Sequence, residues 1–270
     1  MNKKIIMPIL MSTLLLSLVS CNNKYNEIDS FNKEVLNYTN SVSLDTFSSL
    51  NKKLDDHKKE NLNKDYYKET YYYETADTKS KDNSTSYREN SKKVLKHYIA
   101  KADYENKLMQ EQQIVDTTIF SNIDGLKNRE VSHEDDTICY QEINNNVAMI
   151  AKKNEVVTDL RIEWDNFIKN HQPQEEFKIL DMDPNSKYYI DDNVYTVINV
   201  DNNTRIKELR QIVIENDKLS ILKLKESKKQ PNPFLIDLID IVVAEYVEIT
   251  FVNQTLTPIN VKGFDRKVNY

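Results

Sequence analysis

Glycine occurs only twice in this 270-residue chain, at Gly125 and Gly263. Because glycine adopts positive φ angles most readily, a chain so poor in it must make its tight turns with Asn and Asp. Phosphate-binding loops use glycine to let backbone N–H groups approach the ligand, and neither the Walker pattern nor the dinucleotide-binding pattern is present. The G-x-S-x-G pattern of many serine hydrolases is also missing. The sequence therefore excludes several common nucleotide-binding and hydrolase folds.

Alternation of apolar and polar residues predicts antiparallel strands along much of the chain. In the meander expected over 188–225, the turns are Asp201–Asn203 and Asn216-Asp217. There we expect Ile212 to face the core and its neighbour Gln211 to face solvent. Strands are expected at 66–75, 94–104, 108–120, 138–143, 147–151, 177–180, 188–190, 194–200, 205–215, 218–225, 246–253 and 259–264.

Spacings of three and four residues between apolar side chains predict helices at 28–38, 47–54 and 156–168. Trp164 lies on the apolar stripe of the last of these and is expected in the core rather than at a ligand site. The apolar segment 234–243 contains Asp237 and Asp240 and is shorter than the roughly 20 residues that a membrane span needs. We predict a buried helix there.

Each half of the chain thus resembles a helix followed by an antiparallel meander, over 27–151 and over 152–270. The predicted fold class is α+β, with a curved, half-barrel-like antiparallel sheet and a few helices. Either the halves are two related units, or one domain over 27–270 carries its helices on one face of a single sheet. No residue-level repeat decides between the two.

The formal net charge of −6 argues against nucleic-acid binding, which depends on Lys and Arg that neutralise phosphates. Only two cysteines are present, Cys21 and Cys139, so no disulfide framework is expected. Cys139 lies in an alternating apolar run and is interpreted as a small buried hydrophobic residue rather than a reactive thiol.

The most metal-like pattern places Asp181, Asp183, Asn185 and Asp192 at the first, third, fifth and twelfth places of a calcium loop. Ser186 stands where that loop needs glycine, so a polar connection between strands is preferred. Histidines are dispersed, at His57, His97, His133 and His171, and show no metal-ligand spacing. We therefore expect neither a metal, nor a cofactor, nor catalysis.

Tyrosines form the most distinctive cluster in the first predicted strands. Packing within the sheet explains them most simply, but an apolar cavity with polar tips or a protein-binding surface would use them equally well. The tyrosines of these predicted strands are Tyr66, Tyr67, Tyr71, Tyr72, Tyr73, Tyr98 and Tyr104. Alternation in the strand expected at 66–75 places Tyr67, Tyr71 and Tyr73 on one face.

Residues 1–20 have the plan of an export signal, with Lys3 and Lys4 before an apolar run of about fifteen residues. The run closes with Leu18-Val19-Ser20-Cys21, which resembles the lipobox of bacterial lipoprotein precursors. That resemblance implies cleavage before Cys21, lipidation of its thiol and a tether over 21–26. It places the domain on the extracytoplasmic side of the cell membrane or the outer membrane. The alternative is an ordinary signal peptide with an incidental Cys21.

The predicted order of elements, an early helix, the 188–225 meander, a strand at 246–253 and the 156–168 helix, is similar to that of the LolA/LppX class of extracytoplasmic proteins. Members hold lipoproteins or lipids in a cavity between a curved sheet and its helices. The resemblance implies capture of a lipid or another apolar ligand near the membrane. The alternative is an envelope or cell-surface accessory protein that binds another protein.

Overall fold

The computed structural model describes residues 41–81, 87–151, 156–173, 185–201, 206–229, 238–253 and 255–256. Contacts divide the chain into two compact units, Met1–Val42 and Ser43–Tyr270. Everything below concerns the second unit. The predicted lipobox, tether and first helix at 28–38 lie outside the described residues, and so do the expected strands at 177–180 and 259–264.

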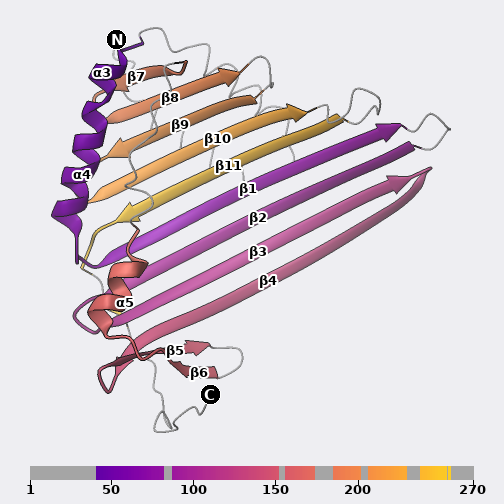
Figure 1. Cartoon of the computed structure of the whole chain (residues 1–270). Helices are drawn as coiled ribbons and strands as arrows, with labels where there is room; N and C mark the ends of the chain where they lie inside the picture. Colours follow the sequence, from indigo (N-terminus) through magenta and orange to yellow (C-terminus); the bar gives the residue numbers. More distant parts are fainter. Residues whose placement is uncertain are drawn as a thin grey trace, which may run out of the picture. The chain divides into compact units, whose positions relative to one another are not determined.

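Eleven strands form a single sheet in the order β6-β5-β4-β3-β2-β1-β11-β10-β9-β8-β7 (Figure 1). Every neighbouring pair is antiparallel. The first six strands are β1 (Tyr66–Lys81), β2 (Tyr87–Asp103), β3 (Leu108–Ile123), β4 (Leu126–Ile143), β5 (Asn146–Ala151) and β6 (Val156–Asp159). The others are β7 (Lys187–Asp191), β8 (Val194–Asp201), β9 (Ile206–Ile214), β10 (Lys218–Lys229) and β11 (Leu238–Thr250).

The predicted α+β class is wrong, because strands dominate the described structure and the helices are minor. Of the two arrangements left open, two units or one sheet, the structure has one sheet. Its two halves are joined where β1 pairs with β11, from Tyr67 opposite Thr250 to Lys79 opposite Leu238. This pairing links strands more than 150 residues apart, which sequence periodicity does not report. The 188–225 meander itself is confirmed as β7 to β10.

Three helices are described: α3 (Leu44–Phe47), α4 (Ser49–Asn61) and α5 (Trp164–His171). The first two confirm the prediction for 47–54. None of the described helices has the length and apolar character that a membrane crossing requires.

Two helix predictions are wrong in part. The segment expected as one helix from Val156 divides into β6 and α5, because Leu160 N–H and Ile162 C=O bond to the backbone of Val147 instead of continuing a helix. In the segment 234–243, the described residues from Leu238 onward belong to β11. The valine and isoleucine residues of this segment are compatible with a buried helix or with a strand. The segment forms a strand because its backbone pairs with β1 and β10.

Tight turns are made as the scarcity of glycine predicts. Asn144 and Asn145 both have positive φ angles, of 51° and 65°, in the turn between β4 and β5. Asp124 and Gly125, at 51° and 89°, form the turn between β3 and β4. Positive φ at both central positions is typical of the type I′ turn that fits the twist of a β-hairpin.

The helices contact one face of the sheet, here called the helix face. The Phe47 ring lies 4.8 Å from that of Tyr188 and 5.9 Å from that of Tyr195. In α5, Phe167 lies 4.8 Å from Tyr140 of β4. Residues directly opposite each other on paired strands have their side chains on the same face of the sheet. A row of opposite partners crosses the sheet from Tyr195 to Tyr98, so both of these side chains lie on the helix face. The intervening partners are Ile212, Ile221, Val247 and Thr70.

Burial on the other face corrects one expectation. Ile212 is 2% exposed, as predicted, but Gln211 on the opposite face is only 4% exposed and donates from Nε2 to Thr196 Oγ1 at 3.1 Å. Both faces of β9 are therefore buried at this point, so strand alternation alone did not identify the solvent side.

Candidate functional site

The strongest candidate site lies on the face opposite the helices, where β1 meets β2 and β11. Alternation places Tyr67, Tyr71 and Tyr73 on this face together, as predicted. The register then brings His97 and Tyr246 opposite Tyr71, and Glu248 opposite Glu69. We define the tyrosine cluster as Tyr67, Glu69, Tyr71, His97, Tyr246 and Glu248.

Glu69 organises the part of the cluster shared by β1 and β2. The Tyr71 hydroxyl donates to Glu69 Oε1 at 2.6 Å, and His97 Nε2 lies 2.7 Å from the same oxygen. The Tyr71 and His97 rings stack, with centroids 4.4 Å apart and planes 8° from parallel. Three side chains thus hold one another in fixed orientations.

Glu248 organises the part of the cluster on β11. It accepts a hydrogen bond from the Tyr246 hydroxyl at 2.6 Å and forms an ion pair with Lys218 of β10 at 2.8 Å. Like charges directly opposite each other destabilise a sheet. Since Glu69 and Glu248 are opposite partners, their hydroxyl, imidazole and ammonium neighbours offset that repulsion.

Lysine side chains extend over the tyrosine rings. Lys101 Nζ lies 5.6 Å from the centre of the Tyr67 ring, and Lys93 Nζ lies 5.6 Å from that of Tyr73. At such distances the ring quadrupole attracts the cation, by about 0.5–1 kcal/mol at exposed positions. The surface therefore combines aromatic rings with charges of both signs.

The tyrosine hydroxyls stay protonated at ordinary pH. Burial raises the pKa of Tyr71, and the hydrogen bond to Glu69 and the charge of Glu69 raise it further. Burial and the bond to Glu248 raise the pKa of Tyr246 in the same way. Both hydroxyls therefore remain neutral hydrogen-bond donors to carboxylates.

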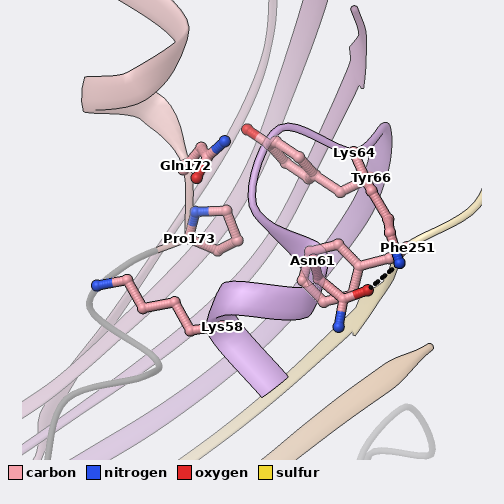
Figure 2. Close-up of a pocket in the computed structure, with 7 residues that line it drawn as sticks. All are labelled: Lys58, Asn61, Lys64, Tyr66, Gln172, Pro173 and Phe251. Carbon is pink, nitrogen blue, oxygen red and sulfur yellow. Dashed lines mark hydrogen bonds between the residues drawn. The ribbon is translucent and has the colours of Figure 1, made fainter. Parts of the chain in front are cut away.

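A small pocket lies on the helix face, between the end of α4 and the segment after α5. Tyr66 stands at its centre and donates from its hydroxyl to the His171 carbonyl at 3.0 Å. The free volume is about 10 Å³, the space of about one water molecule. Figure 2 shows the lining residues, Lys58, Asn61, Lys64, Tyr66, Gln172, Pro173 and Phe251, with Lys64 Nζ donating to Asn61 Oδ1 at 3.0 Å.

The other predicted site residues are not brought together. Cys21, Asp181 and Asp183 lie outside the described residues, and Asn185 and Asp192 belong to no metal-binding group among the residues that are described. Cys139 is buried, and so is Trp164, which packs against Phe167 with ring centres 5.8 Å apart. Both match their predicted structural roles.

The sequence prediction included Tyr67 and Tyr71 but missed Tyr246 and the Glu and His side chains that hold the tyrosines. Glu69 and Glu248 are more than 170 residues apart in sequence and meet only through the pairing of β1 with β11. The one available signal was the Tyr-x-Glu spacing, which recurs at Tyr67, Tyr72 and Tyr246. In a strand this spacing puts both side chains on one face.

No protein-family model matches the chain, and no curated protein matches it. Among solved structures, the translocator domain of the autotransporter NalP from Neisseria meningitidis is similar at 5% identity and a TM-score of 0.32. That match covers 76% of this chain and 95% of that one. OccK7 (OpdD) from Pseudomonas aeruginosa is similar at 7% identity and a TM-score of 0.20, over 63% of this chain and 59% of that one. Likeness at this level carries no inference about fold or function.

Proposed function

We propose that this protein is a lipid-anchored, extracytoplasmic bacterial lipoprotein of the cell envelope that binds another protein through its tyrosine cluster, without catalysing a reaction. The location depends on the lipobox resemblance at Leu18–Cys21. The binding role depends on one observation: the aromatic side chains of the cluster are held in place before any partner arrives.

Fixed aromatic side chains favour protein binding for an energetic reason. Ordering a flexible side chain at an interface costs about 0.5–1.5 kcal/mol, and a side chain that is already ordered avoids that cost. Glu69 fixes Tyr71 and His97, while Glu248 fixes Tyr246. Tyrosine also offers a large apolar ring with a polar tip, a combination enriched at protein interfaces.

The alternative, capture of a lipid or another apolar ligand, needs a larger space. Ligand sites of that kind usually enclose about 300–1,000 Å³ and are lined mainly by apolar groups. The pocket beside Tyr66 offers about 10 Å³, and Lys58, Asn61 and Lys64 contribute polar groups to its lining. That pocket therefore does not suit a lipid, and the ordered side chains of the tyrosine cluster support the protein partner.

The lipid anchor is tested by metabolic labelling with an alkynyl fatty acid. We expect Cys21→Ser to abolish labelling and to block removal of residues 1–20. Cys139→Ser, which changes the other cysteine, is the matched control and should label normally. Undiminished labelling of the Cys21→Ser protein would contradict lipidation at this residue.

The binding surface is tested by placing a photo-crosslinking amino acid at Tyr67 in the full chain in its native host. We expect one discrete protein adduct, which Tyr71→Ala and Tyr246→Ala each remove while the fold is retained by circular dichroism. The same probe at Leu62, which is 46% exposed and lies outside both the cluster and β4, is the control. Saturable lipid binding with no protein adduct would replace this proposal with lipid capture.

A further inference from the structure

The outer edge of β4 is open over most of its length. β5 pairs only with Ile138–Ile143, although β4 begins at Leu126. On that side of 126–137, no strand of the described structure pairs with β4. Every residue over 126–134 is exposed to solvent, and Val131 is 66% exposed. An open strand edge presents unpaired N–H and C=O groups to any strand that can align with it.

The two turns that flank β4 show which backbone groups point outward. In a two-residue hairpin, the residues on either side of the turn bond to each other. Leu126 therefore bonds toward β3, across the Asp124-Gly125 turn, and Ile143 bonds toward β5. The Glu142 N–H donates to the Lys107 carbonyl, so even-numbered residues point toward β3. The odd-numbered residues Lys127, Arg129, Val131, His133 and Asp135 thus direct their N–H and C=O groups to the open edge.

We infer that this edge pairs antiparallel with the same edge of a second copy of the chain, with Val131 facing Val131 across a two-fold axis. The charged residues of β4 are complementary to those of a second, antiparallel copy of β4. On one side of Val131, β4 carries Lys127, Arg129 and Glu130, and on the other side it carries Glu134, Asp135 and Asp136. Antiparallel pairing about Val131 sets Lys127 opposite Asp135 of the second copy, twice by symmetry. Opposite charges in such positions stabilise a strand pair.

Neighbouring registers are less favourable. Shifting the centre to Ser132 sets Arg129 opposite Asp135 but also Glu130 opposite Glu134, so the repulsion offsets the attraction. Shifting it to Glu130 places that residue opposite itself. Like charges directly opposite each other destabilise a strand pair. Parallel pairing in register would likewise align Lys127 with Lys127. The register centred on Val131 avoids all of these contacts and covers the exposed Val131 side chain.

The inferred pairing satisfies the outward backbone groups without changing the fold. Val131 bonds to its symmetry mate, Arg129 to His133 and Lys127 to Asp135, which gives about ten new hydrogen bonds when each narrow pair contributes two. β4 contains no proline and pairs with β3 without a bulge from Leu126 to Gln141. The edge therefore lacks two of the usual devices that block strand pairing.

A single cysteine at the inferred two-fold axis tests the contact in the full chain, expressed in bacteria. Opposite residues in a hydrogen-bonded antiparallel pair have Cα atoms about 5.5 Å apart, within the range of a disulfide. Val131→Cys should give an oxidant-dependent disulfide dimer. Leu126→Cys is the matched control, because in this register its copies lie about 34 Å apart along the strands. The unsubstituted chain controls for Cys21 and Cys139.

Charge reversal then tests the register. In the Val131→Cys background, Lys127→Glu should lower dimer formation by about tenfold, because it affects both symmetric pairs. Adding Asp135→Lys should restore dimer formation. No disulfide with Val131→Cys, equal disulfide formation with Leu126→Cys, or no response to Lys127→Glu would each overturn the inference, provided that circular dichroism shows the chain is folded.

A proline pair gives a second test that does not depend on cysteine chemistry. The Val131 N–H points outward, so Val131→Pro should leave the monomer folded and abolish the dimer measured by sedimentation. Ser132→Pro removes an N–H that bonds to β3 and should reduce thermal stability instead. A dimer that persists with Val131→Pro would contradict pairing through this edge.

Discussion

The two ends of the long strands β1 to β4 are stabilised differently. At the end beneath the helices, here called the covered end, Tyr66, Ala102, Leu108 and Met109 are each at most 2% exposed. At the distal end, beyond about residue 119 of β3, four large apolar side chains are at least 41% exposed: Ile119, Ile123, Leu126 and Val131. Figure 1 shows these strands extending well past α4 and α5.

The covered end and the distal end of the sheet are stabilised by different contributions. The covered end gains from burial of apolar area, at about 25 cal/mol per Å². The distal end depends on the hydrogen-bond ladder between β3 and β4, which continues in register to Ile123 and Leu126. Because a ladder alone contributes little net free energy per bond, we expect the distal end to open locally more often than the covered end.

Placing a charge in the covered region should have the largest effect. Ile212→Asp and Gln211→Asp each bury a carboxylate, and we expect a loss in unfolding free energy on the order of 4 kcal/mol or a strongly raised pKa of the new Asp. Ile123→Asp, at the distal end, is the control and should change stability by less than about 0.5 kcal/mol, because Ile123 is 45% exposed. Urea denaturation measures all three. Equal tolerance at Gln211 and Ile123 would show that the second face of β9 is not buried.

Removing one aromatic ring from the covered end should lower the unfolding free energy by a similar amount. Phe47 is fully buried against Tyr188 and Tyr195, so we expect Phe47→Ala to lower the unfolding free energy by about 3–5 kcal/mol. Leu126→Ala is the distal counterpart and should change it by less than about 0.5 kcal/mol. Similar losses for the two variants would remove the distinction between the ends.

A buried carboxylate at the covered end should also contribute to stability. Asp103 is 1% exposed at the covered end, and its carboxylate accepts from the N–H groups of Asn106 and Leu256, each at 2.9 Å. Burial alone would raise the pKa of Asp103, but the hydrogen bonds to its carboxylate have the larger combined effect. The pKa of Asp103 is therefore lowered. Asp103→Leu leaves both donors unpaired and should cost about 1–3 kcal/mol at pH 7. Thermal denaturation measures this loss, and an unchanged unfolding midpoint in Asp103→Leu would contradict the prediction.

The pH dependence of stability should report on the covered end. His57 of α4 contacts the Glu215 carbonyl from Nε2 at 2.8 Å, and burial lowers the pKa of its imidazole. The folded state then binds the proton less readily than the unfolded chain. The stabilisation that neutral His57 gives the folded state is therefore present above about pH 6.5. It is lost as the pH falls through the lowered pKa. Urea midpoints measured from pH 5 to pH 8 should fall toward low pH, and His57→Gln should flatten that part of the curve.

The smallest effect is expected from an ion pair at the far end of the β1–β2 hairpin. Lys79 Nζ and Glu89 Oε1 are 2.9 Å apart, and the Lys79 side chain is 55% exposed. Glu89→Gln should change the unfolding free energy by less than about 0.5 kcal/mol, and the change should shrink further at high salt. A larger, salt-independent loss would mean that the distal end is more tightly packed than the exposed side chains indicate.

Local features of the sequence were sufficient for most of the strands, for the hairpin turns and for one face of the candidate site, but not for β6 or for the first parts of β4 and β11. Asn144, Asn145 and Asp124 adopt the positive φ angles that scarce glycine made necessary, since conformational preference is a property of each residue. Alternation correctly placed Tyr67, Tyr71 and Tyr73 together, because strand geometry fixes a period of two.

Tertiary structure alone decided the rest, because it depends on contacts between distant segments. Pairing of β1 with β11 decided between the two arrangements that the sequence left open, in favour of one sheet, and it brought Glu69 opposite Glu248. The same pairing made a strand of Leu238–Val243, where an apolar run is compatible with either a helix or a strand. Burial of Gln211 likewise required the whole fold, since a sequence shows which side chains alternate but not how many faces of the sheet are buried.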